Sequence, residues 1–238
     1  DACGSVTSTA VQLAAATAVT FTSSYSLTSC SAGTITLLVQ GGIGTTKTAT
    51  ITNLGNSTVY TATPSSVSGG IYTITFSNQP IGTYSVSVAE QGSACSTSGS
   101  NISLTPVSIT SVTNAQAISC YGGSNGSLTV TAANGTAPYT YAWYSGQTVT
   151  GSIIGTSATK TGLAAGYYTV VVTDALGCTA TYTQQLTQPD EIVPDGSPNN
   201  PLCSNTTDGT ISSVNLLTFG GTGSYTYAWT ASGGGVIP

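Results

Sequence analysis

The sequence predicts an all-β protein made of tandem immunoglobulin-like β-sandwich repeats of about 80–90 residues, arranged as beads on a string and stapled by disulfides. Three observations predict this class. Apolar and polar residues alternate in runs such as SLTVTA, YYTVVVTD and TITLLVQ, as in half-buried strands. Cysteines recur at a nearly constant spacing, and no stretch carries helix start and stop signals.

The six cysteines form two interleaved series. The first series, which we call the opening cysteines, is Cys30, Cys120 and Cys203, and the second series, the closing cysteines, is Cys3, Cys95 and Cys178. Neighbours are 90 and 83 residues apart in the first series and 92 and 83 residues apart in the second. A strand with a Gly-rich exit follows each opening cysteine. A strand such as AGYYTVVVTDALGC precedes the closing cysteine, so one period governs both series.

These contexts divide the chain into four parts. Residues 1–18 are expected to be the tail of a preceding repeat, 19–106 a complete β-sandwich repeat, 107–190 a second complete repeat, and 191–238 a linker with the head of a truncated following repeat. The sequence is therefore expected to be part of a longer array of tandem repeats. Because each repeat has its own cysteine pair and closing strand, independent sandwiches are favoured over a continuous solenoid.

The cysteines predict an oxidising compartment, because disulfides persist there and Ser/Thr-rich β domains are commonly stapled outside the cytosol. We predict the bonds Cys30–Cys95 and Cys120–Cys178, each joining the start of the first core strand to the loop after the last. Cys3 and Cys203 then have no partner within the chain. The alternatives are buried thiols or metal ligands, although the sequence has no CxxC pair and no His to complete a zinc site.

The second repeat resembles the SprB-type repeat of large cell-surface adhesins in gliding Bacteroidetes. The motifs that carry this resemblance are Cys120 followed by NGSLTV, PYTYAW at 138–143, LAAGYYTVVVTDALGC at 163–178, and Gln188-Pro189. The segment 203–229 matches in part, and the first repeat departs because GGIGTTKTATI replaces PYTYAW. The resemblance implies an exported, repetitive surface protein that is delivered by a type IX secretion system and works in adhesion and gliding.

Two groups of aromatic residues have expected structural roles. Alternating residues share one strand face, so we expect a core role for Tyr139, Tyr141 and Trp143, and for Tyr225, Tyr227 and Trp229. A sugar-stacking platform is the alternative and would require exposed rings. Tyr84 and Tyr168 each stand two residues after a Gly at the start of a closing strand, as in a tyrosine corner.

The few charged residues have predicted roles as well. Asp190, Glu191 and Asp195 lie in the Pro-rich segment QPDEIVPDGSPNNP, where calcium is possible beside a semi-rigid linker. Asp174 and Asp208 are expected to cap turns. Lys47 and Lys160 are expected to be solvated surface lysines, with isopeptide cross-links as the weaker alternative. We expect no cofactor other than possible calcium.

Composition excludes several function classes. Only two lysines oppose seven acids, for a net charge of −5, which argues against nucleic-acid binding. No apolar run is long enough to span a bilayer. Without His, Ser and Cys lack their usual base. GGSNG at 122–126 precedes a strand and is interpreted as a turn. The sequence therefore predicts that the protein is not an enzyme.

Three hypotheses for function remain. The first is a non-catalytic structural or adhesive segment of a large repetitive extracellular surface protein or surface filament. The second is a self-assembling extracellular fibre subunit that neighbouring chains complete, and the third is a carbohydrate-binding module. Expected partners are neighbouring repeats of the same chain, laterally associated copies and surface polysaccharide.

Overall fold

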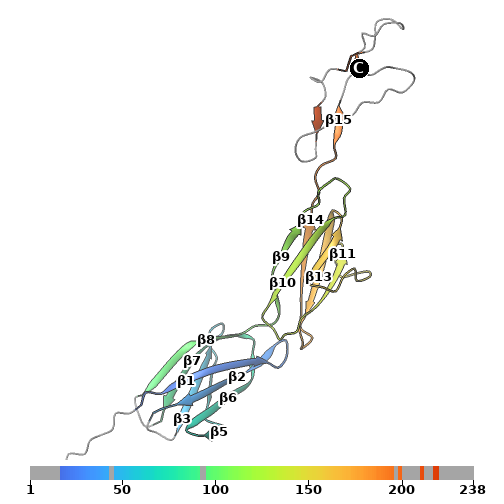
Figure 1. Ribbon diagram of the computed structural model, residues 1–238. Helices are drawn as coiled ribbons and strands as arrows, with labels where there is room; N and C mark the ends of the chain where they lie inside the picture. Colours follow the sequence, from blue (N-terminus) through green and yellow to red (C-terminus); the bar gives the residue numbers. More distant parts are fainter. Residues whose placement is uncertain are drawn as a thin grey trace, which may run out of the picture. The chain divides into compact units, whose positions relative to one another are not determined.

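The computed structural model describes residues 17–42, 46–91 and 95–192, and the backbone of four short strands after residue 192. These strands form two antiparallel pairs, β15 (Val193–Asp195) with β18 (Leu217–Phe219) and β16 (Pro198–Asn199) with β17 (Thr210–Ile211). All regular structure in the described residues is β-strand (Figure 1), so the predicted all-β class is confirmed. Within these residues, no helix is long and apolar enough to cross a bilayer.

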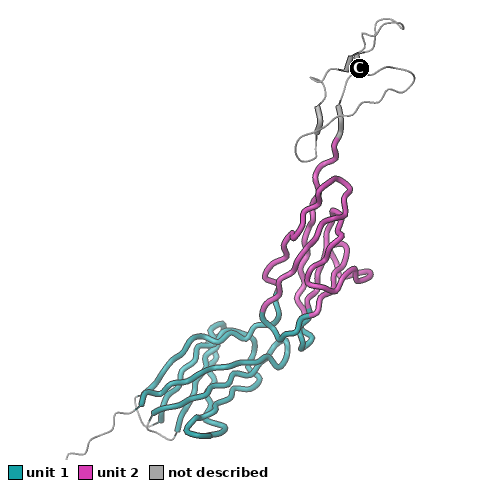
Figure 2. Tube along the Cα trace, in the orientation of Figure 1, with its two compact units in different colours: residues 1–108, 134–139, 173–178 teal, residues 109–133, 140–172, 179–238 magenta. Residues whose placement is uncertain are grey.

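The chain forms two compact units (Figure 2). Unit 1 contains residues 1–108 together with two segments of the second predicted repeat, 134–139 and 173–178. Unit 2 contains residues 109–133, 140–172 and 179–238.

The first predicted repeat folds as two four-stranded sheets. One sheet has the order β1-β2-β6-β5 and the other has the order β4-β3-β7-β8. Their strands are β1 (Thr20–Leu27), β2 (Ala32–Gln40), β3 (Lys47–Asn53), β4 (Val59–Ala62), β5 (Ser66–Ser68), β6 (Ile71–Pro80), β7 (Gly82–Glu90) and β8 (Ser96–Leu104). Every strand pair in these two sheets is antiparallel.

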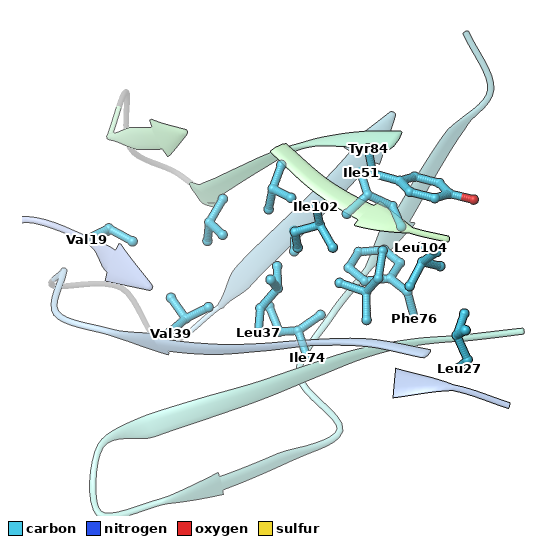
Figure 3. Close-up of a cluster of buried hydrophobic side chains, with 14 residues drawn as sticks. Val19, Leu27, Leu37, Val39, Ile51, Ile74, Phe76, Tyr84, Ile102 and Leu104 are labelled. Carbon is cyan, nitrogen blue, oxygen red and sulfur yellow. The ribbon is translucent and has the colours of Figure 1, made fainter. Parts of the chain in front are cut away.

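A single apolar core lies between these two sheets (Figure 3). Strands β2 and β6 supply Ile35, Leu37 and Ile74 from one sheet, while β3 and β7 supply Ile51 and Tyr84 from the other. Side chains alternate between buried and more exposed along β2 and β3, because successive residues of a strand point to opposite faces of its sheet. The alternation in TITLLVQ therefore corresponds to burial in this core.

The strands of the second predicted repeat form two three-stranded sheets, β12-β10-β9 and β11-β13-β14. Their bounds are β9 (Ser108–Gln116), β10 (Gly126–Ala133), β11 (Thr140–Ser145), β12 (Thr159–Leu163), β13 (Gly166–Thr173) and β14 (Thr179–Leu186). Both sheets contribute fully buried side chains, such as Leu128 from β10 and Val170 from β13. Trp143, on β11, is the largest buried side chain of this part of the chain.

Both closing strands begin with a tyrosine corner. Tyr84 and Tyr168 each donate a hydrogen bond to a backbone carbonyl four residues earlier, to Pro80 at 2.5 Å and to Ala164 at 3.0 Å. Both phenol rings are buried, and this burial raises the pKa of both hydroxyls. Each tyrosine is the third residue of its strand, so β7 of the first repeat is equivalent to β13 of the second repeat.

The two ends of the first sandwich carry different cysteines. The chain reaches the sandwich at Thr17, whose carbonyl accepts a hydrogen bond from Gly42, and Cys95 lies at this same end because its carbonyl accepts the Glu90 N–H. We call this the leading end. The chain leaves after Leu104, at the start of β7. Ser31, next to Cys30, accepts the Ile81 N–H there, and we call this the trailing end.

The second sandwich has the same polarity. Its chain reaches β9 through Thr105, whose carbonyl accepts the Gly135 N–H, and Cys178 lies at this leading end. Leu163, the end of β12, pairs with Gly126 at the opposite end. There Gln188 accepts the Gly122 N–H at 2.9 Å, close to Cys120. Each repeat thus carries its closing cysteine at its leading end and its opening cysteine at its trailing end.

Candidate functional site at the disulfide-linked loops

The disulfide of the described residues joins Cys30 to Cys178, whose Cα atoms are 5.3 Å apart. Both predicted bonds, Cys30–Cys95 and Cys120–Cys178, are therefore wrong. Cys30 lies between β1 and β2, Cys178 lies between β13 and β14, and both belong to unit 1. The bond thus links the opening cysteine of the first repeat to the closing cysteine of the second.

Strand length explains why the predicted bonds do not form. A disulfide requires Cα atoms about 4.4–6.8 Å apart. Cys30 and Cys95 are separated by the whole of β7, which has nine residues and so spans about 26 Å. Cys120 and Cys178 are separated in the same way by the eight residues of β13. Each sandwich therefore keeps its two cysteines at opposite ends.

Asp174 organises the loop that carries Cys178. One carboxylate oxygen accepts the backbone N–H groups of Leu176 and Cys178, each at 2.9 Å, and the other accepts the Thr136 N–H at 3.0 Å. The bond to Leu176 is the Asx turn expected for Asp174. The bond to Thr136 goes further, because it ties this loop to the loop 134–139. The second expected cap, Asp208, lies outside the described residues.

These donors also set the charge state of Asp174. Its side chain is buried, and burial by itself would raise the pKa of the carboxyl group. The three backbone N–H groups stabilise the carboxylate more strongly, so the pKa is lowered from its ordinary value. Asp174 is consequently a buried anion that holds the Cys178 loop in shape at neutral pH.

Gly135 allows this loop to close against the chain before β9. Its φ is +61°, and a Cβ at this position would lie 2.7 Å from the Asp174 carboxylate and 2.8 Å from the Val107 backbone nitrogen. Only glycine combines this backbone conformation with such a close approach. The Gly135 N–H donates to the Thr105 carbonyl at 3.2 Å, so the loop 134–139, Asp174 and the chain before β9 form one hydrogen-bonded group.

The equivalent position in the first repeat uses different chemistry. Glu90 ends β7 as Asp174 follows β13, and its carboxylate lies 2.5 Å from Lys47 Nζ. Both side chains are buried, and the Lys47 ammonium also lies 5.5 Å from the centre of the Tyr72 ring. A buried ammonium requires a nearby anion. In the first repeat the Lys47 ammonium therefore stabilises the buried Glu90 carboxylate. In the second repeat, backbone N–H groups stabilise the buried Asp174 carboxylate.

The expectation of a solvated Lys47 is therefore wrong, and its physical reason is the pairing of β3 with β7. Lys47 is the direct cross-strand partner of Glu90, so the sheet register places both groups inside the leading end. Gly42 lies against them, because a Cβ there would come within 2.5 Å of Lys47 Nζ. Lys160 is half-buried, and its ammonium donates to the Thr161 carbonyl at 2.8 Å.

The aromatic motif of the second repeat is divided between core and surface. Trp143 is completely buried, and its indole N–H donates to the Ser157 carbonyl at 2.8 Å. Tyr139 and Tyr141 are only half-buried, and the Tyr139 hydroxyl donates to the Asn134 carbonyl. Trp143 is thus a packing residue. Tyr225, Tyr227 and Trp229 lie outside the described residues.

The predicted calcium residues are only partly described. Asp190 and Glu191 are exposed, and the side chain of Asp195 lies outside the described part. Among the described residues, no group of three or more His, Cys, Asp or Glu side chains is placed to hold a metal ion. Cys95 and Cys120 are both exposed, and Cys3 and Cys203 lie outside the described residues.

A small pocket lies beside the disulfide-linked loops in unit 1. It has a volume of about 270 Å³ and is lined by Tyr25, Ser26, Leu27, Thr105 and residues 134–137. Tyr25 is its one aromatic lining residue, with 58% of its surface exposed. The rest of the lining combines the hydroxyl and amide groups of Ser26, Thr105, Asn134 and Thr136 with the apolar side chains of Leu27 and Ala137. The pocket was not predicted, because its residues come from three separate segments of the sequence.

Comparison with known proteins supports the sequence resemblance. Residues 112–148 match the family model of the SprB repeat, so the resemblance is confirmed for this segment, which contains Cys120, β10 and Trp143. The sequence comparison with curated proteins found no match.

Two solved structures are among the matches. The first is a C-terminal 282-residue fragment of intimin, in complex with the intimin-binding domain of the translocated intimin receptor. It has 20% identity and a TM-score of 0.30, with 76% of this chain and 67% of that chain covered. The second is the BSP domain of a biofilm-associated protein, with 19% identity, a TM-score of 0.25, and 65% and 27% covered.

Breaking the buried ion pair is expected to destabilise the first sandwich. Replacing one partner, as in Lys47→Met or Glu90→Leu, leaves the other charge buried without its counter-ion and should cost about 3–5 kcal/mol. The double variant should recover most of this loss, because it leaves no buried charge. Urea denaturation measures the loss in the free energy of unfolding. Hydrogen exchange of peptides from β3 and β7 in the folded protein shows where the loss occurs. Lys160→Met is the control and should change the free energy by less than about 0.5 kcal/mol; an equal loss there would refute the special role of the pair.

Acid is expected to loosen the Cys178 loop through Asp174. Because its pKa is lower in the folded protein, Asp174 contributes stability that is present above its unfolded pKa and is lost as the pH falls through the folded pKa. Asp174→Asn should remove this part of the pH dependence and cost about 1.5–3 kcal/mol at pH 7. Urea unfolding between pH 7 and pH 2 checks both effects. Asp190→Asn, at an exposed position, should leave the profile unchanged, and an identical profile for both variants would contradict the assignment.

Proposed function

We propose that this chain is a non-catalytic structural and adhesive segment of a large, repetitive protein of the cell surface. The match of residues 112–148 to the SprB repeat carries this proposal. Two further observations support it. The described strands build two sandwich cores with the repeat period of the sequence, and a disulfide joins loops of successive repeats, as expected for an oxidising compartment.

In this proposal the segment is a scaffold that displays its own outer surface. The first sandwich has one apolar core and the second buries apolar side chains such as Leu128, while the tyrosine corners and Trp143 are used for packing. Buried carboxylates are engaged in structure, Asp174 by backbone donors and Glu90 by Lys47. In this proposal the repeats extend a filament or cover the cell surface. Export by a type IX secretion system and work in gliding motility complete the proposal.

Surface exposure and chain size test the proposal together. An antibody against residues 107–190 should detect a band of hundreds of kilodaltons in reduced, denatured cells. Proteinase K added to intact cells should remove this band, while a periplasmic marker protein survives. A band near 23.6 kDa would favour the fibre-subunit hypothesis instead. A band that resists protease on intact cells would contradict the surface location. In-frame deletion of residues 107–190 should reduce attachment or gliding without preventing export.

Lateral association of these segments is a second part of the proposal. Eight strands lie at the edges of the four sheets that form the two sandwiches, and only β12 among them carries a charged residue, Lys160. Uncharged edges expose unpaired N–H and C=O groups that another edge can pair with. The hydroxyl-rich edges therefore favour pairing between copies or with neighbouring filaments.

A charge placed on an edge strand should weaken this association. Val67 lies on the outer strand β5 and is 58% exposed, so Val67→Lys should lower the apparent mass that analytical ultracentrifugation measures at high protein concentration. Val149 is 52% exposed and lies outside the strands, so Val149→Lys is the matched control. Monomer alone at high concentration in the unmodified chain would contradict lateral association.

A further inference from the structure

The two leading ends of the described repeats are built alike. Gly42 donates to the Thr17 carbonyl at 2.9 Å, as Gly135 donates to the Thr105 carbonyl at 3.2 Å. In both cases the accepting residue belongs to the chain just before the sandwich. Both glycines have positive φ, and an added Cβ at either one would touch the buried carboxylate of its own leading end. The leading end of the first repeat thus has the hydrogen-bonding pattern of the end that carries the bonded Cys178.

The closing cysteines occupy the same position within these ends. The Glu90 N–H donates to the Cys95 carbonyl at 3.1 Å, and the Asp174 N–H donates to the Cys178 carbonyl at 2.9 Å. Cys95 and Cys178 therefore close equivalent loops after equivalent strands. The loop of the first repeat thus confirms that a closing cysteine lies at the leading end of its sandwich, where Cys178 is bonded to a cysteine of the preceding repeat.

The trailing ends correspond in the same way. Cys30 lies in the turn that precedes β2, next to the point where the chain leaves the first sandwich. Cys120 lies in the loop that precedes β10. Its neighbour Gly122 donates to Gln188, on the chain that leaves the second sandwich. Cys120 is exposed, so its thiol is accessible to a partner at this end.

Bonds within the second repeat are excluded for Cys120. Cys178 is already bonded to Cys30 and lies at the far end of β13. Cys203, an opening cysteine by its sequence context, is equivalent to Cys120 itself and not to Cys178. The partner that matches Cys178 is the closing cysteine of the following repeat. By the spacing within the two complete repeats, it stands 58 to 65 residues after Cys203.

We propose that the opening cysteine of each repeat is bonded to the closing cysteine of the next repeat, so that Cys120 is joined to the closing cysteine of the repeat that begins with Cys203. This proposal rests on the proposed function, because it requires further repeats in the same chain. The array is then a ladder in which one disulfide spans each junction between successive repeats.

The chemistry of each bond is an oxidation by thiol–disulfide exchange. Two cysteine thiols lose two protons and two electrons as the S–S bond forms. An oxidoreductase in the compartment to which the protein is exported accepts these protons and electrons, and its own disulfide is reduced to a dithiol. Each bond forms only after the later repeat has supplied its closing cysteine. The ladder is therefore completed in the order in which the repeats fold.

Disulfide mapping of the native full-length chain tests the proposal. Surface protein is alkylated without reduction, digested, and analysed by mass spectrometry. The expected result is one peptide pair linking Cys30 to Cys178 and a second pair linking Cys120 to a closing cysteine that follows Cys203. Recovery of Cys120 as an alkylated thiol would overturn the proposal. So would a bond from Cys120 to Cys95, to Cys178, to Cys203 or to a second chain.

A Cys120→Ser variant of the full-length chain provides an independent readout. It should leave one closing cysteine of the following repeat open to alkylation, while the Cys30–Cys178 pair is recovered unchanged. Ser119→Ala, at the neighbouring exposed position, is the matched control and should release no thiol. If Cys120→Ser releases no thiol, the ladder is wrong even where the protein is large and surface-exposed, so this failure is distinct from failure of the proposed function.

Discussion

The distance between the two ends of a sandwich is the constraint on which the rest of this structure depends. Strands β7 and β13 have nine and eight residues and keep the ends about 25 Å apart, several times the Cα separation that a disulfide spans. Cysteines at opposite ends of one repeat cannot meet. The bond from Cys30 to Cys178 therefore closes a loop across 148 residues, for which the chain-entropy model assigns about 5 kcal/mol.

The leading ends show two solutions to one packing problem. A glycine with positive φ brings the loop against a buried carboxylate in both repeats. Asp174 is short enough to accept backbone N–H groups of its own loop, whereas the longer Glu90 reaches across to Lys47 on β3. Both arrangements satisfy a buried charge. The loop that bears the closing cysteine is held in shape by either one.

The scarcity of charge has consequences for the surface. The sequence has only two lysines, and one of them is used inside the first sandwich. Hydroxyl-rich strands such as β1 and β8 then cover the outside with neutral hydrogen-bonding groups. Such a surface depends little on ionic strength, because it has few ion pairs to screen. It also has little repulsion with which to keep similar edges apart.

Local sequence patterns determined the fold class and much of its interior. Alternation predicted strands such as β2 and β13, and the Gly-x-Tyr pattern predicted the corners at Tyr84 and Tyr168. These features depend on residues a few positions apart. Strands β1 to β8 and strands β9 to β14 form separate sheets, and each of these two sets contains one tyrosine corner.

The cysteine pairing and the burial of Lys47 were decided only by tertiary structure. Spacing aligns Cys30 with Cys120, but it does not reveal the end of a sandwich at which each cysteine lies. That depends on how many times the chain reverses before the closing strand. Lys47 meets Glu90 across 43 residues of sequence, through a register that no local pattern specifies. Periodicity thus determined which residues are equivalent, and the direction of each strand decided which of them meet.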